Sequence, residues 1–350
     1  MEYNNYSNNF NYQNDYYYQL KAAKKRERKA LSRNVTKLAV LLLAYNILSS
    51  VFLSVYYYMV YAYFNHEITL DYNRVVVYLS GQQELINSSL FSMLGNLFVV
   101  FFSLVITMLI AVCAMNIDLT ELLSPRKGQI KQGAKWFPVC MTVNLFVSVL
   151  VSIFTLVMEE AGVTVPDVDF SVTQNNWLTV TTQVAYVIII GPIAEELIYR
   201  GLILTLLKPF GKWMAVFFSA LIFGLMHGNI PQAVPAFAGA IIYGLVAIHC
   251  NSIIPTILIH IANNALASYS DFADIFSWPE EIYSVCMIAV VLAGIYIFMT
   301  NYYKLKITDE VRGALSSGGK YMAVIFNPAM IIYFLMNLIT FISWFVMENM

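Results

Sequence analysis

Nine apolar stretches dominate this chain of 350 residues, and most of them are long enough to cross a membrane as a helix. A helix needs about 20 apolar residues to span the hydrocarbon core of a bilayer. The composition, 59% hydrophobic and only 12% charged, excludes an ordinary soluble domain. The sequence therefore predicts an all-α fold, a polytopic transmembrane helical bundle of about eight or nine spans. The candidate spans are residues 38–64, 90–115, 136–158, 178–207, 213–230, 232–249, 253–270, 282–301 and 321–347.

The segment before the first span has a different composition. Residues 1–20 are mostly Asn and Tyr, with too few aliphatic side chains to build a core, and we expect them to be disordered. Residues 21–37 carry eight Lys or Arg and a single acidic residue, Glu27. A basic block directly before an apolar run is typical of the cytoplasmic side and can bind anionic lipid. We therefore expect a disordered cytoplasmic tail over residues 1–36 that contacts anionic lipid, and no nucleic-acid partner.

The loop charges indicate the orientation of the bundle. With the N-terminus in the cytoplasm, nearly every loop Lys and Arg lies on the inner side, as the positive-inside rule requires, and only Arg74 departs from the pattern. The sequence therefore predicts an integral membrane protein with a cytoplasmic N-terminus. The inner loops carry Arg126, Lys127, Lys131, Lys135, Lys208, Lys212, Lys304, Lys306, Arg312 and Lys320. The outer loops carry Glu159, Glu160, Asp167, Asp169, Asp271, Asp274, Glu280 and Glu281.

The fourth stretch contains three charges, Glu195, Glu196 and Arg200, in an otherwise apolar helix. An ionisable side chain in the hydrocarbon costs a few kcal/mol and needs a partner or a wet cavity. Glu196 and Arg200 are four residues apart, which predicts an ion pair on one helix face. Glu195 is rotated by about 100° and has no local cation, so we expect it to face a cavity as a general base. The alternative is a purely structural ion pair between helices.

Two later motifs also place polar groups in apolar helices. Phe223 and His227 are four residues apart, as are His260 and Asn264, so each pair shares a helix face. At 1.5 Å of rise per residue, Glu195 and the polar members of both pairs lie about 14 to 22 Å from the predicted inner surface. This common depth predicts one site built from three helices. Packing and hydrogen bonds between helices remain the alternative for each residue alone.

These groups suit the hydrolysis of an amide. Glu195 and His227 can polarise a water molecule, and His260 and Asn264 can donate hydrogen bonds to the oxyanion of the tetrahedral intermediate. The motifs place no Ser or Cys beside a His, so they do not support a covalent nucleophile. Zinc held by Glu195, His227 and His260 is chemically possible, but the HExxH signature is missing. We therefore expect no cofactor, with zinc as the second possibility.

The motifs resemble a known family. In the same order, they are similar to the three signature motifs of the CAAX protease and bacteriocin-processing family, also called Abi, whose intramembrane endopeptidases include the type II CAAX prenyl proteases. The resemblance covers about residues 178–270. The motifs are Glu195-Glu196-x-x-x-Arg200, Phe223-x-x-x-His227 and His260-x-x-x-Asn264.

This resemblance implies a glutamate-dependent intramembrane protease that opens towards the cytosol, in the plasma membrane of a bacterium. It implies that Glu195 and His227 activate water and that His260 and Asn264 form the oxyanion site. Glu196 and Arg200 then support and orient that site, with Phe223 beside them. The substrate is a membrane-associated peptide or a lipidated protein.

The implied organisation has four parts. Residues 37–175 form N-terminal transmembrane helices, residues 176–272 the family-like catalytic core, and residues 273–350 C-terminal transmembrane helices, after the tail already described. Two other functions stay open, a non-catalytic membrane immunity or scaffold protein and a proton-coupled transporter. We find no internal repeat of the kind that marks many transporters.

Overall fold

A computed structural model describes residues 3–115, 117–167, 177–308 and 313–350. Within these ranges the chain forms helices and connecting loops and no strand, which confirms the predicted all-α bundle. The helices are α1 (Tyr3–Asn65), α2 (Tyr72–Ser80), α3 (Gln83–Ile86), α4 (Ser89–Met115), α5 (Leu119–Leu123), α6 (Gln129–Ala134), α7 (Phe137–Glu160), α8 (Trp177–Gln183), η1 (Val184–Ile190), α9 (Gly191–Glu196), η2 (Leu197–Leu204), α10 (Thr205–Leu207), α11 (Lys212–Leu225), α12 (Ile230–Cys250), α13 (Ile254–Ala267), α14 (Tyr269–Phe276), α15 (Glu280–Asn301), η3 (Tyr302–Leu305), α16 (Ser317–Ile325) and α17 (Pro328–Glu348).

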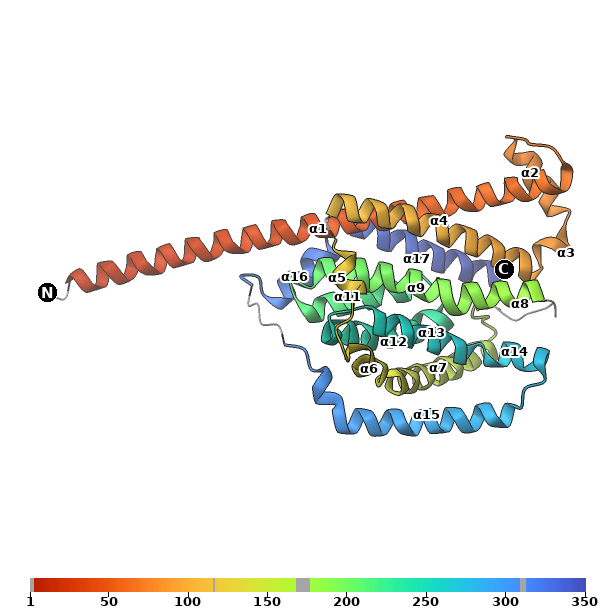
Figure 1. Cartoon of the computed structure of the whole chain (residues 1–350). Helices are drawn as coiled ribbons and strands as arrows, with labels where there is room; N and C mark the ends of the chain where they lie inside the picture. The colour runs from red at the N-terminus through yellow and green to blue at the C-terminus, as the bar shows by residue number, and fades with distance from the viewer. Residues whose placement is uncertain (1–2, 116, 168–176, 309–312) are drawn as a thin grey trace.

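The long helices lie roughly side by side (Figure 1). Helix α1 packs on α4 and α17 at one side of the bundle, and α15 packs on α7 at the opposite side. The segment from α8 to α13 lies between these two sides, and α11 and α12 form an antiparallel pair within it. The outer helices therefore enclose the segment that carries the three motifs.

Among the described residues, six helices are long and apolar enough to cross a membrane. They coincide with six of the nine stretches predicted from the sequence. Helices α11 and α13 have 14 residues each, which corresponds to about 21 Å, less than the thickness of a typical hydrocarbon core. The remaining stretch, 178–207, is a run of short α- and π-helical segments from α8 to α10. The six spanning helices are in Asp15–Asn65, Ser89–Met115, Gln129–Glu160, Ile230–Cys250, Glu280–Leu305 and Pro328–Glu348.

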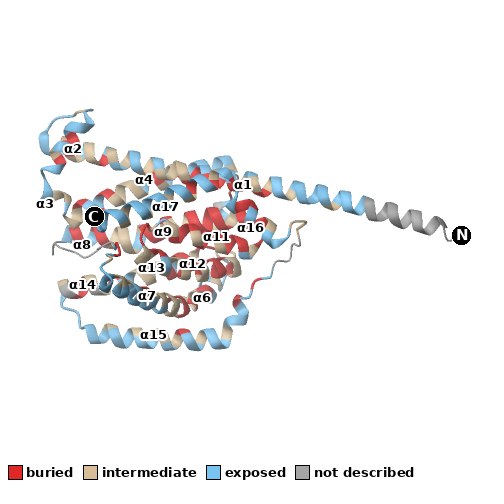
Figure 2. Ribbon diagram, turned by 180° about the vertical axis from the view of Figure 1, so that it is seen from behind, coloured by how far each residue is buried: buried red, intermediate tan, exposed pale blue. Residues whose placement is uncertain are grey.

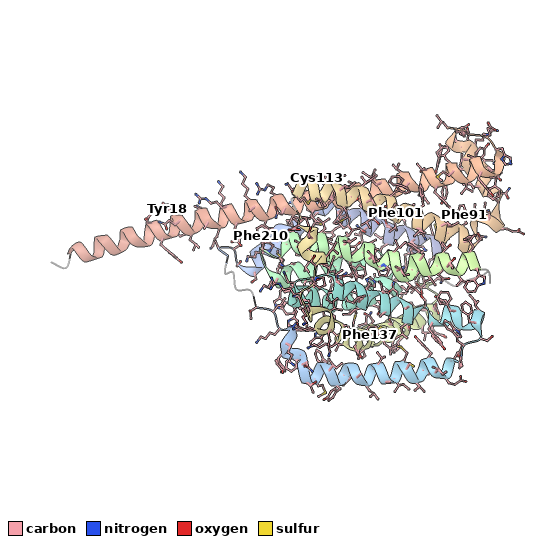
Figure 3. All side chains as sticks on the ribbon, viewed as in Figure 1. Tyr18, Phe91, Phe101, Cys113, Phe137 and Phe210 are labelled. Atoms are coloured by element: carbon pink, nitrogen blue, oxygen red, sulfur yellow. The ribbon has the colours of Figure 1, made fainter. Side chains whose placement is uncertain are left out.

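The predicted disordered tail is not what the structure has, because α1 continues back to Tyr3 as one helix of 63 residues. Extending an existing helix is much easier than nucleating one, and the Lys, Arg, Gln and Ala of the basic block are good helix formers. The prediction that this segment builds no core agrees with the structure. This part of α1 projects from the bundle, and the side chain of Tyr18 is exposed (Figure 3).

Burial concentrates in the centre of the bundle (Figure 2). In α12, half of the most apolar stretch is buried inside the protein. In the span that contains α15, only 6% of the corresponding stretch is buried. Since the outer helices expose mainly apolar side chains, the natural environment for those surfaces is lipid. The buried centre is formed by η2, α10, α11 and α12 together with one face of α1.

The central segment is helical but irregular. The two π-helices, η1 and η2, flank α9, the short helix that contains both glutamates. Turns of π-helix are often found at functional sites. A Cβ atom on Gly191, at the junction of η1 and α9, would lie 2.8 Å from the carbonyl oxygen of Tyr186, so this position requires glycine. The Ser219 hydroxyl donates a hydrogen bond of 2.8 Å to the carbonyl of Tyr199 within η2.

The structure also bears on the loop charges. Arg74, the exception to the predicted orientation, forms a bidentate ion pair with Glu67, and both hydrogen bonds are 2.8 Å long. Asp169 and Arg312 lie outside the described residues, as does the boundary at residue 176. The other domain boundaries remain predictions.

Candidate active site

A cavity of about 790 Å³ lies among the helices of the bundle. Its walls come from α7, η1, α9, α12 and α13, from the end of α11, and from residues of α14 and α15. Two of the predicted residues, Glu196 and Arg200, are fully buried behind its wall. The structure brings the other five to the cavity surface. They are Glu195, Phe223, His227, His260 and Asn264.

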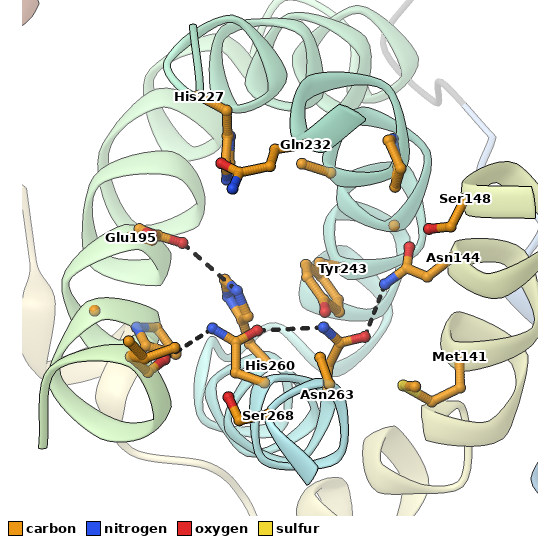
Figure 4. Close-up of a pocket in the computed structure, with 18 of the residues that line it drawn as sticks. Met141, Asn144, Ser148, Glu195, His227, Gln232, Tyr243, His260, Asn263 and Ser268 are labelled. Atoms are coloured by element: carbon orange, nitrogen blue, oxygen red, sulfur yellow. Dashed lines mark hydrogen bonds and ion pairs between the residues drawn. The ribbon is translucent and has the colours of Figure 1, made fainter. Parts of the chain in front are cut away.

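His260 lies between the two glutamates. Its Nδ1 atom is 3.1 Å from Oε1 of Glu196, and its Nε2 atom is 3.5 Å from Oε2 of Glu195. A carboxylate only accepts hydrogen bonds, so Nδ1 donates to Glu196. The other ring nitrogen then faces the cavity beside Glu195 (Figure 4). Sequence spacing could not indicate this bridge, because the glutamates and the histidine are on different helices.

The ion pair predicted between Glu196 and Arg200 is confirmed, with a distance of 2.7 Å between Oε1 and Nη1 and no exposure of either side chain. Arg200 also donates a hydrogen bond of 3.2 Å to the carbonyl of Ala240. Its guanidinium carbon lies 5.0 Å from the ring centroids of both Phe223 and Tyr243. The cation is thus held between two aromatic faces, which compensates in part for its removal from water.

The aromatic rings extend this packing to the histidines. Phe223 meets His227 and His260 edge to face, at centroid distances of 5.1 and 5.7 Å. Tyr243 stacks on His260 with a centroid distance of 5.1 Å and an interplanar angle of 29°. Phe223 was predicted as a supporting residue, whereas Tyr243 was missed, because no local pattern distinguishes it from an ordinary core tyrosine.

His227 follows the C-terminal end of α11, in the turn before α12. Its Nδ1 atom lies 3.0 Å from the carbonyl oxygen of Phe223, which can only accept, so Nδ1 carries the hydrogen. In the neutral ring, Nε2 therefore has a free lone pair. The turn is fixed by Asn229, which donates 3.1 Å to the carbonyl of His227 and accepts 2.8 Å from the backbone of Gln232. Glu195 and His227 both point into the opening in Figure 4.

Asn264 is held by a chain of hydrogen bonds. Its Nδ2 atom donates 2.9 Å to the carbonyl of Val187 in η1, and its oxygen accepts 3.2 Å from Asn263. Asn263 in turn accepts 2.8 Å from Asn144 of α7. One of the two N–H groups of Asn264 is thus used, and the second is available to another acceptor. Asn144 was missed, although a polar amide within the apolar stretch 136–158 was a usable signal.

Among the described residues, no group of three His, Cys, Asp or Glu side chains is arranged to hold a metal ion. Nδ1 of His260 is engaged by Glu196, and its Nε2 lies 3.5 Å from Oε2 of Glu195. The alternative zinc set of Glu195, His227 and His260 remains a prediction from the sequence.

The cavity lies towards one end of the bundle. Its lining includes Gln232 at the start of α12 and Asp271 in α14. Helix α14 lies at the end of the bundle away from the connection between α10 and α11 (Figure 1), which carries Lys208. The loop charges predict that this end faces outside, whereas the resemblance implies an opening towards the cytosol. The two expectations disagree for this chain.

Comparison with protein families supports the resemblance. The family described as type II CAAX prenyl endopeptidase, Rce1-like, matches residues 176–266. We call residues 176–266 the CAAX-type domain, after the family that they match. This segment contains all seven residues predicted for the site. No curated protein and no solved structure matches the chain.

The match covers the segment from α8 to α13, and the long apolar helices around it make the chain an integral membrane protein. The helices on both sides of the match supply part of the same cavity. Asn144 and Ser148 line it from α7, and Tyr283 lines it from α15. The site is therefore completed by parts of the chain that the family match does not include.

Proposed function

We propose that the protein is an intramembrane endopeptidase that hydrolyses a peptide bond in a membrane-associated or lipidated substrate. Glu195 and His227 activate the attacking water, and His260 and Asn264 stabilise the oxyanion. The observation that supports this function most strongly is the meeting of polar groups from α9, α11, α13 and their connections at one cavity within the CAAX-type domain.

Water activation follows from two acceptors that face the same space. The carboxylate of Glu195 accepts one hydrogen of a water molecule, and the lone pair on Nε2 of His227 accepts the other. The water oxygen is then free to attack the peptide carbonyl. The proton taken from water is returned to the leaving amine, so Glu195 and His227 serve as general base and then as general acid.

The oxyanion receives hydrogen bonds from the other side. In its imidazolium form His260 carries a hydrogen on both ring nitrogens, so Nδ1 donates to Glu196 while Nε2 donates to the oxyanion from the cavity side, and Asn264 contributes its second N–H group. Arg200 acts through Glu196 and touches no reacting atom in this mechanism. Both donors come from the same face of α13, one helical turn apart, and face the same cavity.

The size of the cavity favours an extended peptide. A volume of about 790 Å³ is in the range of sites that enclose a ligand of a few residues, and it is too small for a folded domain. The family name adds the chemical class, a prenylated C-terminal CAAX peptide. We propose such a lipidated peptide as substrate, with its lipid in the bilayer and its backbone in the cavity.

Cleavage by the purified protein tests this function. Wild-type protein in detergent should release the C-terminal fragment from a farnesylated CAAX peptide and should act much more slowly on the same peptide without the lipid. Glu195→Gln should lower cleavage by about 10²- to 10⁴-fold while the thermal unfolding midpoint stays close to that of wild type. Equal cleavage by folded Glu195→Gln would contradict the mechanism.

Chelator treatment tests the metal-free form of the mechanism. We expect the cleavage rate to stay unchanged after incubation with 1,10-phenanthroline and EDTA, because Glu195 and His227 activate water directly. Loss of activity that returns when zinc is added would overturn this part of the proposal.

We also propose that the N-terminus is cytoplasmic. In a protein with Cys113 and Cys286 replaced by Ser, a membrane-impermeant thiol reagent should label Glu281→Cys in intact cells, since the first turn of α15 is exposed at the predicted outer end. Lys21→Cys should react only after permeabilisation. The reverse pattern would contradict the orientation and would place the Asp271 end of the cavity in the cytosol.

A further inference from the structure

Asn144 lies in α7, outside the CAAX-type domain, yet it begins the chain of hydrogen bonds that ends at Asn264 (Figure 4). Its Nδ2 donates to Oδ1 of Asn263 at 2.8 Å, and Nδ2 of Asn263 donates to Oδ1 of Asn264 at 3.2 Å. Asn264 then donates to the carbonyl of Val187 at 2.9 Å. Asn263 and Asn264 each accept one hydrogen bond and donate another in this chain, so the direction of one amide fixes the direction of the next.

The neighbouring helix leaves space for this amide. A Cβ atom on Gly239 of α12 would lie 2.3 Å from Oδ1 and 3.0 Å from Nδ2 of Asn144. Any larger residue at position 239 would therefore displace the Asn144 side chain. Other residues of the same helix turn the opposite way, since Phe146 is 64% exposed on the apolar outer surface. Asn144 is thus directed inward by the packing of α7 on α12.

Packing alone does not account for the amide. Oδ1 of Asn144 is buried and has no hydrogen-bond partner among the described residues. A buried acceptor without a partner keeps its desolvation penalty, and an apolar side chain of similar size would avoid it. The amide has one defined effect on the site, which is to orient Asn263 through its N–H group.

We propose that Asn144 is a positioning residue for the oxyanion donor Asn264. An asparagine side chain can rotate by half a turn and exchange its oxygen and nitrogen. With Asn263 fixed by Asn144, the oxygen of Asn264 is occupied, and its NH₂ group points to Val187 and to the cavity. Without Asn144, Asn263 is free to turn, and Asn264 no longer presents its N–H reliably to the peptide oxygen. This inference rests on the proposed function.

Kinetics of two Asn144 variants test the inference. Asn144→Leu removes the amide without adding charge, and Asn144→Asp keeps the shape but loses the donor. We expect kcat on the farnesylated peptide to fall by about 10- to 100-fold in both, with KM within about twofold of wild type, because one oxyanion donor is weakened while substrate binding persists. Phe146→Leu is the matched control, since Phe146 lies on the same helix but faces the outer surface and does not line the cavity. It should leave kcat unchanged.

A double-mutant cycle separates positioning from a merely structural role. If Asn144 acts through Asn264, Asn144→Leu should have little further effect on kcat in the Asn264→Ala background. Wild-type kinetics in both Asn144 variants, or equal losses in the two backgrounds, would overturn the inference. If Glu195→Gln abolishes cleavage while Asn144→Leu cleaves as fast as wild type, this inference fails and the proposed function stands. If folded Glu195→Gln still cleaves, the proposed mechanism itself fails.

Discussion

Two arginine–glutamate pairs in this protein have nearly the same contact distance in opposite surroundings. The contact of Arg200 with Glu196 is 2.7 Å long, and that of Arg74 with Glu67 is 2.8 Å long. Both members of the first pair are fully buried, whereas the side chains of the second are 52% and 48% exposed.

The difference lies in what each pair would lose on opening. Charges that separate at the surface are taken up by water, so such a pair is worth roughly 0–1 kcal/mol. Breaking a buried pair leaves a charge without water, which costs about 3–5 kcal/mol. Glu196 has a further partner, since its Oε1 atom also accepts from His260. The buried pair therefore helps to hold His260 in place at the cavity, and the exposed pair does not contact the cavity.

Removal of Arg200 should have the largest effect on stability and cleavage. Arg200→Ala should destabilise the protein by about 3–5 kcal/mol and abolish cleavage, because Glu196 then remains buried without its cation. Chemical unfolding in mixed micelles measures the loss. Arg200→Lys is the matched control and should lose less, since it keeps the charge but cannot repeat the planar contact with both rings. Wild-type stability in Arg200→Ala would mean that water reaches this pair.

The aromatic face of Arg200 has a smaller expected effect. Tyr243→Leu removes a ring that covers both the guanidinium and His260, and we expect a loss of about 1–3 kcal/mol together with a lower kcat. The corresponding ring at the surface pair is Tyr61, whose centroid lies 5.9 Å from Arg74. Tyr61→Leu is the matching variant at the exposed pair, and its activity and stability should be measured beside those of Tyr243→Leu. Tyr61→Leu should leave kcat unchanged, because neither Tyr61 nor Arg74 lines the cavity.

The smallest expected effect belongs to the exposed pair. Arg74→Ala should change the free energy of unfolding by no more than about 1 kcal/mol, and any change should shrink at high salt. Cleavage should be that of wild type. A loss as large as that of Arg200→Ala would show that burial is not what separates the two pairs.

The sequence was sufficient for features with a local cause. The length and polarity of the apolar stretches predicted the bundle, and the spacing of Glu196 and Arg200 predicted their ion pair. The three motifs also identified five residues that line the cavity. Each of these predictions depends on residues within one helix or on the polarity of a single segment.

Other features depend on how separate helices meet, and no local pattern specifies them. The position of His260 between two glutamates, and the chain from Asn144 to Asn264, both join helices far apart in the sequence. The π-helical turns around α9 are stabilised by tertiary contacts such as that of Ser219 with Tyr199. The N-terminal prediction was wrong for a different reason, because composition reports the lack of a core and not the helix that continues from α1.

A double-mutant cycle tests directly whether Glu195 and His227 act on one water molecule. kcat/KM on the farnesylated peptide is measured for Glu195→Gln, His227→Ala and the double variant, with folding checked by thermal unfolding. If both groups act on the same water, the double variant should be nearly as active as the slower single variant. If the two losses multiply in the double variant, Glu195 and His227 act independently. That result would contradict the activation of one water molecule by both groups.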